Sequence, residues 1–203
     1  DRVLAVDAAG RLVDGDHLIA MCAIDRHERG LLHDGTVVVT VLSNLGFRQA
    51  MAERGITVVD TAVGDRYVLE ALDRGGWTLG GEQSGHLIFR DLATTGDGLL
   101  AGLAVADLVV RSGRSLADLA DEAMVRLPQV MVNVRVARRD PALIDRLAPQ
   151  VAEAEARLAG RGRVLLRPSG TEPLIRVMVE APDEAEAQAE ADALAAAVRA
   201  AAG

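Results

Sequence analysis

Apolar residues recur along the chain with two periods, one typical of buried strands and one typical of amphipathic helices. The clearest strand pattern is the β-branched run from Thr36 to Leu42, and Ile56–Val59 is a second run that predicts a buried strand. Helical patterns follow these two runs, from about Phe47 to Arg54 and at Tyr67–Asp73. Strands that alternate with helices in this way predict an α/β layer for the first part of the chain.

The rest of the first part fits the same plan. Its predicted elements are two short strands within residues 2–13, a helix from residue 14 to about 29, a glycine-interrupted strand segment at Trp77–Phe89, and helices at Gly98–Val110 and Ser115–Met124. We interpret Asp14-Gly15-Asp16 as the cap of the first of these helices and Asp97 as the cap of a later one, because Asp side chains accept hydrogen bonds from free helical N–H groups.

After Leu127-Pro128 the pattern changes, which predicts a second, smaller module. Its predicted elements are a half-buried strand at Val130–Val136, a long polar helix from Asp140 to about Leu158, two antiparallel strands at Val164–Leu166 and Leu174–Val179, and a helix from Asp183 to Ala202. This order indicates an α+β domain. We therefore predict two domains, residues 1–124 and 125–203, the first α/β and the second α+β.

Composition narrows the classes of function. The net charge of −8 argues against non-specific nucleic-acid binding, which requires a basic surface. No apolar run approaches the ~20 residues of a membrane span, and the chain does not open with a secretory signal pattern. The single cysteine, Cys22, lies in an apolar helical stretch and is interpreted as a buried structural thiol. We expect a cytoplasmic protein with neither nucleic acid nor membrane as a partner.

The stretch Arg167-Pro168-Ser169-Gly170-Thr171 carries the strongest chemical signal. Together with Arg176 in the next strand it offers two guanidinium groups, two hydroxyls and an uncrowded glycine amide, which are the groups that hold a phosphate dianion. It lacks the Gly-Lys-Ser/Thr ending of a nucleotide-binding P-loop. The alternative is a tight turn, since Pro, Ser and Gly are common turn residues.

A second candidate is Gly80-Gly81-Glu82-Gln83-Ser84-Gly85-His86. The paired glycines allow backbone turns that other residues resist. On an extended backbone Glu82, Ser84 and His86 project to one side, and their carboxylate, hydroxyl and imidazole would suit a polyol. A polar hairpin with a capped turn is the alternative.

A third candidate is the loop Thr61–Tyr67, which follows the predicted strand at Ile56–Val59. Loops beyond the carboxyl ends of buried strands are where α/β folds place ligands. The alternative is that Asp65 only caps the next helix. The remaining histidines show no zinc-like spacing and are expected to lie on the surface or to pack in the core. They are His17, His27 and His33.

These segments resemble the α-D-phosphohexomutases, and within that family the bacterial branch that acts on glucosamine phosphates. Glu82-Gln83-Ser84-Gly85-His86 is similar to the family's sugar loop, and Arg167 to Pro173 is similar to its phosphate loop. Residues 61–68 look like that branch's specificity loop. The resemblance runs the full length of the chain in the same order.

The resemblance implies the third and fourth of four domains. The third is a three-layer α/β domain with a mixed sheet that binds sugar. The fourth binds phosphate and has an antiparallel sheet with two helices, similar to the TATA-box-binding protein. Asp1-Arg2 match the end of the family's magnesium loop, so Asp1 would be one Mg²⁺ ligand of an incomplete site. The phosphoserine domain has no counterpart here, so we expect a fragment that is inactive without the N-terminal domains.

By the same resemblance, the parent enzyme interconverts glucosamine 6-phosphate and glucosamine 1-phosphate through an enzyme phosphoserine and a bisphosphate. This reaction feeds UDP-N-acetylglucosamine and peptidoglycan synthesis. The implied roles are phosphate binding by Arg167, Ser169, Gly170, Thr171 and Arg176; sugar binding by Glu82, Ser84, His86, Gly64, Asp65 and Arg66; and catalysis by Arg2 and His86. A phosphomannomutase or phosphoglucomutase fragment, or a stand-alone phosphosugar-binding module, remains an alternative.

Overall fold

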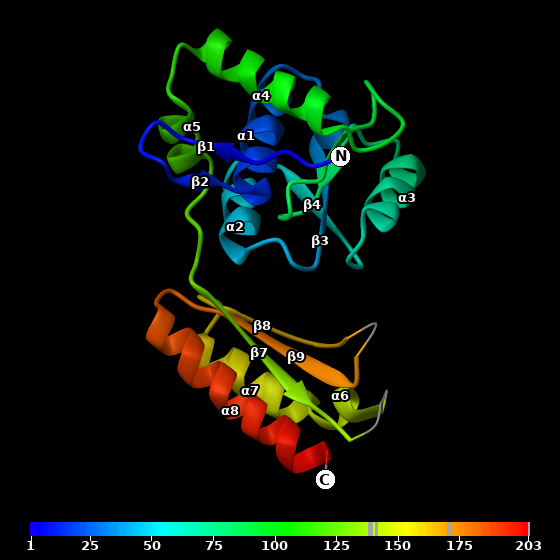
Figure 1. Cartoon of the computed structure of the whole chain (residues 1–203), viewed down its shortest axis with the longest axis vertical. Helices are drawn as coiled ribbons and strands as arrows, with labels where there is room; N and C mark the ends of the chain where they lie inside the picture. Colours follow the sequence, from blue (N-terminus) through cyan, green and yellow to red (C-terminus); the bar gives the residue numbers. More distant parts are fainter. Residues whose placement is uncertain (138–139, 141, 170–171, 203) are drawn as a thin grey trace. The chain divides into compact units, whose positions relative to one another are not determined.

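A computed structural model describes residues 1–137, 140, 142–169 and 172–202. The chain divides into two compact units, Asp1–Arg126 and Leu127–Gly203 (Figure 1). Within the described residues, none of the helices combines the length and the apolar character that a membrane span needs.

The first unit is built on a four-stranded mixed sheet in the order β4-β3-β5-β6. The central strand β3 (Thr36–Thr40) pairs in parallel with β4 (Thr57–Thr61) and with β5 (Leu79–Gly81). The last strand, β6 (Leu87–Phe89), returns antiparallel to β5. The remaining elements are the two-stranded ribbon of β1 (Ala5–Val6) and β2 (Leu12–Val13), the 3-10 turn η1 (His33–Gly35), and the helices α1 (Gly15–Glu28), α2 (Leu45–Glu53), α3 (Asp65–Gly75), α4 (Gly98–Ser112) and α5 (Leu116–Ala123).

Both faces of this sheet are covered, which gives three layers. Val37 and Val39 on β3 belong to the larger core, which α1, α2, α4 and α5 complete. Val38 points the other way and packs with Val68 and Leu72 of α3. Successive strand residues serve opposite faces, so the whole of β3 is buried, with three valines at its centre and a threonine at each end. The predicted α/β domain with a mixed sheet is confirmed, as are the caps at Asp14 and Asp97.

The prediction of a buried strand at Ile56–Val59 was wrong in one respect. The strand exists as β4, but it lies at the edge of the sheet, and none of its five residues is fully buried. A β-branched run does not distinguish an edge strand from a central one, because both favour the same side chains.

The interpretation of Gly80-Gly81 as turn residues was also wrong, because both lie within β5. A Cβ atom on Gly80 would stand 2.8 Å from Val68, and one on Gly81 would stand 3.0 Å from Ile19. The two glycines therefore let α3 and α1 approach the strand closely from its two sides.

The second unit is a three-stranded antiparallel sheet in the order β7-β9-β8, with its helices on one face (Figure 1). Its strands are β7 (Gln129–Arg135), β8 (Arg163–Pro168) and β9 (Leu174–Glu180), and its helices are α6 (Ala142–Arg146), α7 (Ala148–Leu158) and α8 (Glu184–Ala202). Ile175, Val177 and Val179 of β9 face the helices and form the centre of the core. The alternate residues of β9 therefore point to the opposite face, which the helices leave uncovered and which we call the open face, although Leu174, Met178 and Glu180 on it are buried. The predicted α+β class is confirmed.

The single long helix predicted from Asp140 to Leu158 was wrong, since the structure has two helices, α6 and α7, separated by Leu147. Pro149 stands in the first turn of α7, where a missing N–H costs nothing. A continuous helix would place the ring of Pro149 against the carbonyl of the preceding turn. The polar pattern alone did not reveal this break.

Candidate functional site

Three loops meet at the edge of the first sheet where the parallel strands end. They follow β3, β4 and β5 at residues 41–44, 62–64 and 82–86. The Val41 N–H donates to the carbonyl oxygen of Thr61 at 3.0 Å, and the Gly64 N–H donates to Glu82 Oε1 at 2.9 Å. The carboxyl edge of the sheet is thus a connected surface, where α/β folds commonly place ligands.

We call residues 82–86 the hairpin loop, since they join β5 to β6. The Glu82 N–H donates to the His86 carbonyl at 2.9 Å, and the Gly85 N–H donates to the Glu82 carbonyl at 3.0 Å. The expectation of an extended backbone, with Glu82, Ser84 and His86 projecting to one side, was therefore wrong. The two tight hydrogen bonds fold the segment into a turn.

The hairpin loop is fastened to its surroundings by further backbone hydrogen bonds. Val3 donates to the Gly85 carbonyl at 2.9 Å, and Gly15, at the start of α1, donates to the Gln83 carbonyl at 3.1 Å. Since Glu82 also accepts from Gly64, the loop is held from three separate segments. Its shape is set before any ligand arrives.

Within this loop, His86 is buried, and its nearest charged groups are carboxylates. Its side chain is between two carboxylates: Nδ1 lies 3.8 Å from Asp1 Oδ2, and Nε2 lies 3.8 Å from Asp65 Oδ2. Nε2 makes no hydrogen bond with any described residue, and neither does the buried Oγ of Ser84. Buried polar atoms of this kind are costly unless something satisfies them, so both atoms are candidates for a further hydrogen bond.

The loop before α3 supplies exposed groups rather than buried ones. Gly64, with φ 133°, is the N-cap of α3, so the alternative that Asp65 only caps this helix was wrong, and Asp65 stands in the first turn. The guanidinium of Arg66 lies 4.8 Å from the ring centre of Tyr67 and 3.4 Å from Glu70. Its side chain is 71% exposed, which leaves it free to reach a ligand.

The first two residues carry the metal and catalytic predictions. Asp1 and Arg2 are both exposed, and the carboxylate of Asp1 is 70% exposed. A free carboxylate is a suitable Mg²⁺ ligand. Among the described residues, however, no group of three metal-ligating side chains comes together. Asp1 therefore fits as one ligand of a site that this part of the chain does not complete.

In the second unit, three residues form one row across the open face of the sheet. Arg167 on β8 pairs directly with Arg176 on β9, and Arg176 pairs with Asn133 on β7. Directly opposed residues of an antiparallel sheet project from the same face. We call Asn133, Arg176 and Arg167 the arginine row. The strand register thus brings together the two guanidinium groups that the sequence offered for phosphate binding.

The arginine row has unbalanced positive charge. Burial and the neighbouring charge of Arg176 hold the pKa of Arg167 below its usual value. Neither arginine forms an ion pair within the described part of the chain, and Arg176 Nε is buried without a hydrogen bond there. At the other end of the same face, by contrast, Arg163 is paired with the buried carboxylate of Glu180 at 3.0 Å. Two like charges side by side without compensation favour an anion.

The rest of the predicted phosphate loop is described only in part. Ser169 is buried, and its Oγ accepts a hydrogen bond from the Glu172 N–H at 3.3 Å. Gly170 and Thr171 lie outside the described residues. Sequence reasoning missed Asn133 and the exposed Arg135, which project from the same open face of β7. Their alternation with buried residues was visible in the sequence, but the register that brings Asn133 beside Arg176 was not.

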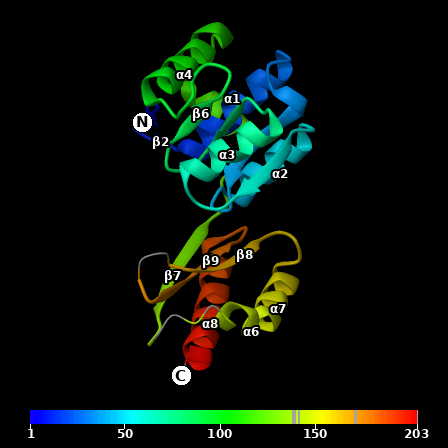
Figure 2. The ribbon, with the colours of Figure 1, turned by 90° about the vertical axis from the view of Figure 1, so that its right-hand side faces the viewer.

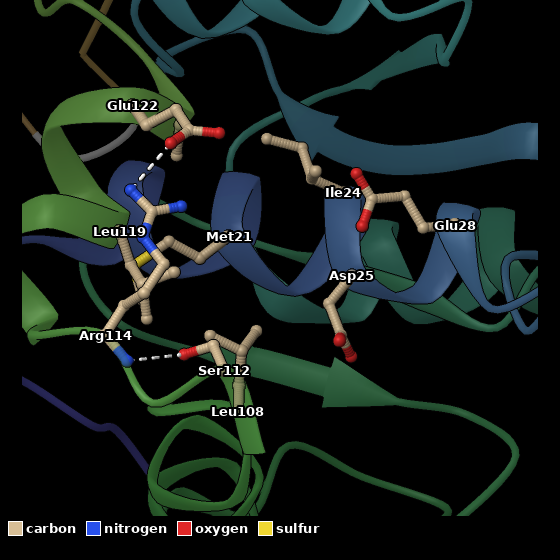
Figure 3. A pocket seen from close by; sticks show the side chains of 10 residues that line it. Met21, Ile24, Asp25, Glu28, Leu108, Ser112, Arg114, Leu119 and Glu122 are labelled. Atoms are coloured by element: carbon tan, nitrogen blue, oxygen red, sulfur yellow. Dashed lines mark hydrogen bonds and ion pairs between the residues drawn. The ribbon is translucent and has the colours of Figure 1, made fainter. Parts of the chain in front are cut away.

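A cavity of about 150 Å³ between α1, α4 and α5 is separate from these groups (Figure 3). Met21, Leu108 and Leu119 give it an apolar wall, and Arg114 at its rim is paired with Glu122 at 2.6 Å. No predicted site residue lines it. We interpret it as a packing gap where three helices meet.

Comparison with known proteins agrees with this arrangement in both units. Residues 14–127 match the family model described as phosphoglucomutase/phosphomannomutase, alpha/beta/alpha domain III. Residues 131–197 match the model for the C-terminal domain of the same family. The two matches occur in the order of the two units.

Curated relatives share high identity with the chain. It is 61% identical over 202 residues to the phosphoglucosamine mutase of Frankia alni, covering 99% of this chain and 44% of that protein. It is 58% identical over 182 residues to the phosphoglucosamine mutase of Thermobifida fusca, covering 89% of this chain and 40% of that protein. The chain thus spans less than half the length of these relatives.

The fold also matches a solved structure. The N-acetylphosphoglucosamine mutase of Aspergillus fumigatus, in complex with GlcNAc-6P and magnesium, superposes with a TM-score of 0.79. The match covers 98% of this chain and 46% of the fungal chain, at 22% sequence identity. At this identity, the likeness supports the fold of the two units.

Proposed function

Because the chain belongs to the phosphoglucomutase/phosphomannomutase family, we propose that it is the sugar- and phosphate-binding part of an enzyme that interconverts glucosamine 6-phosphate and glucosamine 1-phosphate. The relatives named phosphoglucosamine mutase motivate the choice of substrate. The observation that carries the proposal is the uncompensated pair of Arg167 and Arg176 on one sheet row. Such a pair is costly in a folded protein unless it serves an anion.

In this proposal the two units have different tasks. The arginine row and Ser169 would bind the phosphate that is not being transferred, as a fixed electrostatic and hydrogen-bonding grip. Gly170 and Thr171, which lie outside the described residues, would add a backbone N–H and a hydroxyl. Glu82 and Ser84 would bind the sugar hydroxyls: the carboxylate accepts hydrogen bonds, and the hydroxyl both donates and accepts them.

The groups around His86 would act nearer to the reacting phosphate. His86 would donate a hydrogen bond from Nε2, which is buried and makes no hydrogen bond with the described residues. Arg2 would add positive charge, and Gly64, Asp65 and Arg66 would contact the sugar from the adjoining loop. When bound, Mg²⁺ would neutralise charge on the transferred group, and Asp1 would be one of its oxygen ligands. The phosphoserine and the other metal ligands would come from the preceding domains.

Isothermal titration calorimetry of the 203-residue chain with glucosamine 6-phosphate tests the binding proposal. We expect Arg167→Met to weaken binding about tenfold to hundredfold, because a hydrogen bond to a charged group contributes about 1.5–3 kcal/mol. Arg161→Met is the matched control. It also removes one positive charge, but Arg161 lies elsewhere on the surface, where it pairs with Glu186. Equal affinity in the Arg167 variant and the control would contradict the assignment.

In this proposal, activity requires the domains that precede the matched region in the relatives, so a fusion tests the reaction. The chain would be joined behind the part of the Frankia alni relative that precedes the matched region. We expect the fusion to convert glucosamine 6-phosphate and the isolated chain to be inactive. Faster turnover of mannose or glucose phosphates would favour the phosphomannomutase or phosphoglucomutase alternative. Binding without activity in the fusion would favour a stand-alone binding module.

The cytoplasmic location stays a prediction.

A further inference from the structure

The segment Gly96-Asp97-Gly98, between β6 and α4, packs against two parts of the candidate site. Gly96 is buried, and a Cβ atom at this position would lie 1.9 Å from Nε2 of His86 and 2.3 Å from its Cδ2. Real Cβ atoms do not approach other atoms so closely. The imidazole edge therefore occupies the space that any larger residue at 96 would need.

Gly98 makes the corresponding contact with the N-terminal segment. A Cβ atom there would lie 2.3 Å from the carbonyl oxygen of Arg2 and 2.7 Å from its carbonyl carbon. Figures 1 and 2 both show the N-terminus beside α4, which begins at Gly98. The backbone of Arg2 therefore packs directly against the first turn of α4.

Asp97 fixes the conformation of the segment between the two glycines. Its Oδ1 accepts hydrogen bonds from the N–H groups of Leu99 and Leu100 at 2.9 and 3.2 Å. Asp97 is thus the N-cap of α4, and its hydrogen bonds hold the two flanking glycines at the start of the helix. Neither glycine has a positive φ, so the requirement for glycine at both positions comes from space alone.

We propose that Gly96-Asp97-Gly98 is a positioning element for the site, which sets the place of the His86 ring and of the first two residues. His86 is 5% exposed, and its two ring nitrogens lie 3.8 Å from Asp1 and from Asp65. A side chain at residue 96 would move Nε2, the nitrogen that faces Asp65. The relevance of this placement to catalysis rests on the proposed function, whereas the packing itself does not.

A double-mutant cycle on the 203-residue chain tests the packing. Gly96→Ala should lower the thermal midpoint of the first unit by about 5 °C, as expected for overpacking in a domain of this size. In a His86→Ala background the imidazole is gone, so the same change should have almost no effect. If Gly96→Ala does not fold, recovery of folding in the double variant is the supporting result.

Gly102→Ala is the matched control, since a Cβ there would meet only Val3 at 3.7 Å, an ordinary contact. It lies inside α4, where alanine is favoured over glycine, so its midpoint should stay the same or rise. Equal destabilisation by Gly96→Ala with and without the His86 ring would overturn the proposal, because the glycine would then serve the backbone and not the imidazole.

The chemical shifts of the histidine rings in NMR spectra distinguish positioning of His86 from a purely structural role, which would leave them unchanged. Gly96→Ala should shift the ring resonances of His86 and leave those of His27 and His33 in place, whereas Gly102→Ala should shift none of them. An unshifted His86 signal would overturn positioning of the ring. Titration of the same samples with inorganic phosphate reports separately on the arginine row, so a failure of the proposed function would appear there.

Discussion

The hairpin loop and the arginine row are both candidate binding regions, but they are built in opposite ways. The hairpin loop is held by backbone hydrogen bonds from Val3 and Gly15 and by the Gly64 N–H donated to Glu82. The arginine row consists of exposed or half-buried side chains on an open sheet face, with two neighbouring positive charges and no described ion pair.

This difference indicates how each region relates stability to function. The contacts that shape the hairpin loop are also contacts that stabilise the first unit, so changes there should damage folding. The arginine row places like charges together at a cost that only an anion relieves. Removing one of its charges should impair binding without harming the fold, as is common where function is maintained against stability.

The largest effect on folding should come from Gly85→Ala in the hairpin loop. Gly85 has φ 91°, and a Cβ atom there would stand 2.2 Å from the carbonyl oxygen of Val3. We expect a loss of roughly 3 kcal/mol or more from backbone strain and overpacking together. Urea unfolding followed by the fluorescence of Trp77, the only tryptophan, reports on the first unit.

Gly113→Ala separates the two causes of this loss. Gly113 has φ 64°, but nothing lies within 4 Å of a Cβ atom at that position. Its cost should therefore be only the roughly 1–2 kcal/mol of the left-handed backbone. If Gly85→Ala costs no more than Gly113→Ala, the close packing of the hairpin loop against Val3 does not matter for stability.

A pH effect on the stability of the first unit is expected from Asp16. Burial raises the pKa of Asp16, at the start of α1, from 3.8 to about 6. The folded state then holds a proton that the unfolded state has released, so stability falls as pH rises from about 4 to about 6. The change corresponds to at most about 3 kcal/mol.

Asp16→Asn provides the comparison for this pH effect, since it cannot ionise. Its free energy of unfolding, followed through Trp77, should be flatter than that of the native chain between about pH 4 and 6. Identical slopes in the two proteins would show that Asp16 does not titrate in this range.

The smallest effect concerns Cys22 on α1. Its side chain is buried, and burial raises the pKa of its thiol to about 12. The thiolate is the reactive form, so iodoacetamide should label the folded chain far more slowly than the urea-unfolded chain. Mass spectrometry measures the labelling, and equal rates in both states would show that this part of the core opens readily.

Sequence reasoning recovered the features that depend on local chemistry. Asp14 and Asp97 cap their helices because the cap depends on a few consecutive residues. The expectation that Arg176 joins Arg167 as a second guanidinium agrees with the strand register, because the loop of a short hairpin limits the possible registers. The roles of these arginines in binding stay predictions.

Features that depend on distant segments were not accessible in the same way. The position of β4 at the sheet edge and the place of Asn133 beside Arg176 are set by strand order and register. The tie between Gly64 and Glu82 joins residues that are distant in sequence. The contact of Gly96 with His86 depends on packing, which residue type alone does not reveal.

Under the proposed function, the arginine row serves anion binding and not stability. The most direct test of this role is to measure the thermal midpoint of the second unit at increasing phosphate concentration, in the native chain and in Arg167→Met. Without phosphate, the variant should be as stable as the native chain or more stable, because it lacks the repulsion from Arg176. Added phosphate should stabilise the native chain by about 2.7 kcal/mol at a hundred times its Kd, and the variant much less. A variant that is less stable without phosphate and gains as much from it as the native chain would contradict the account.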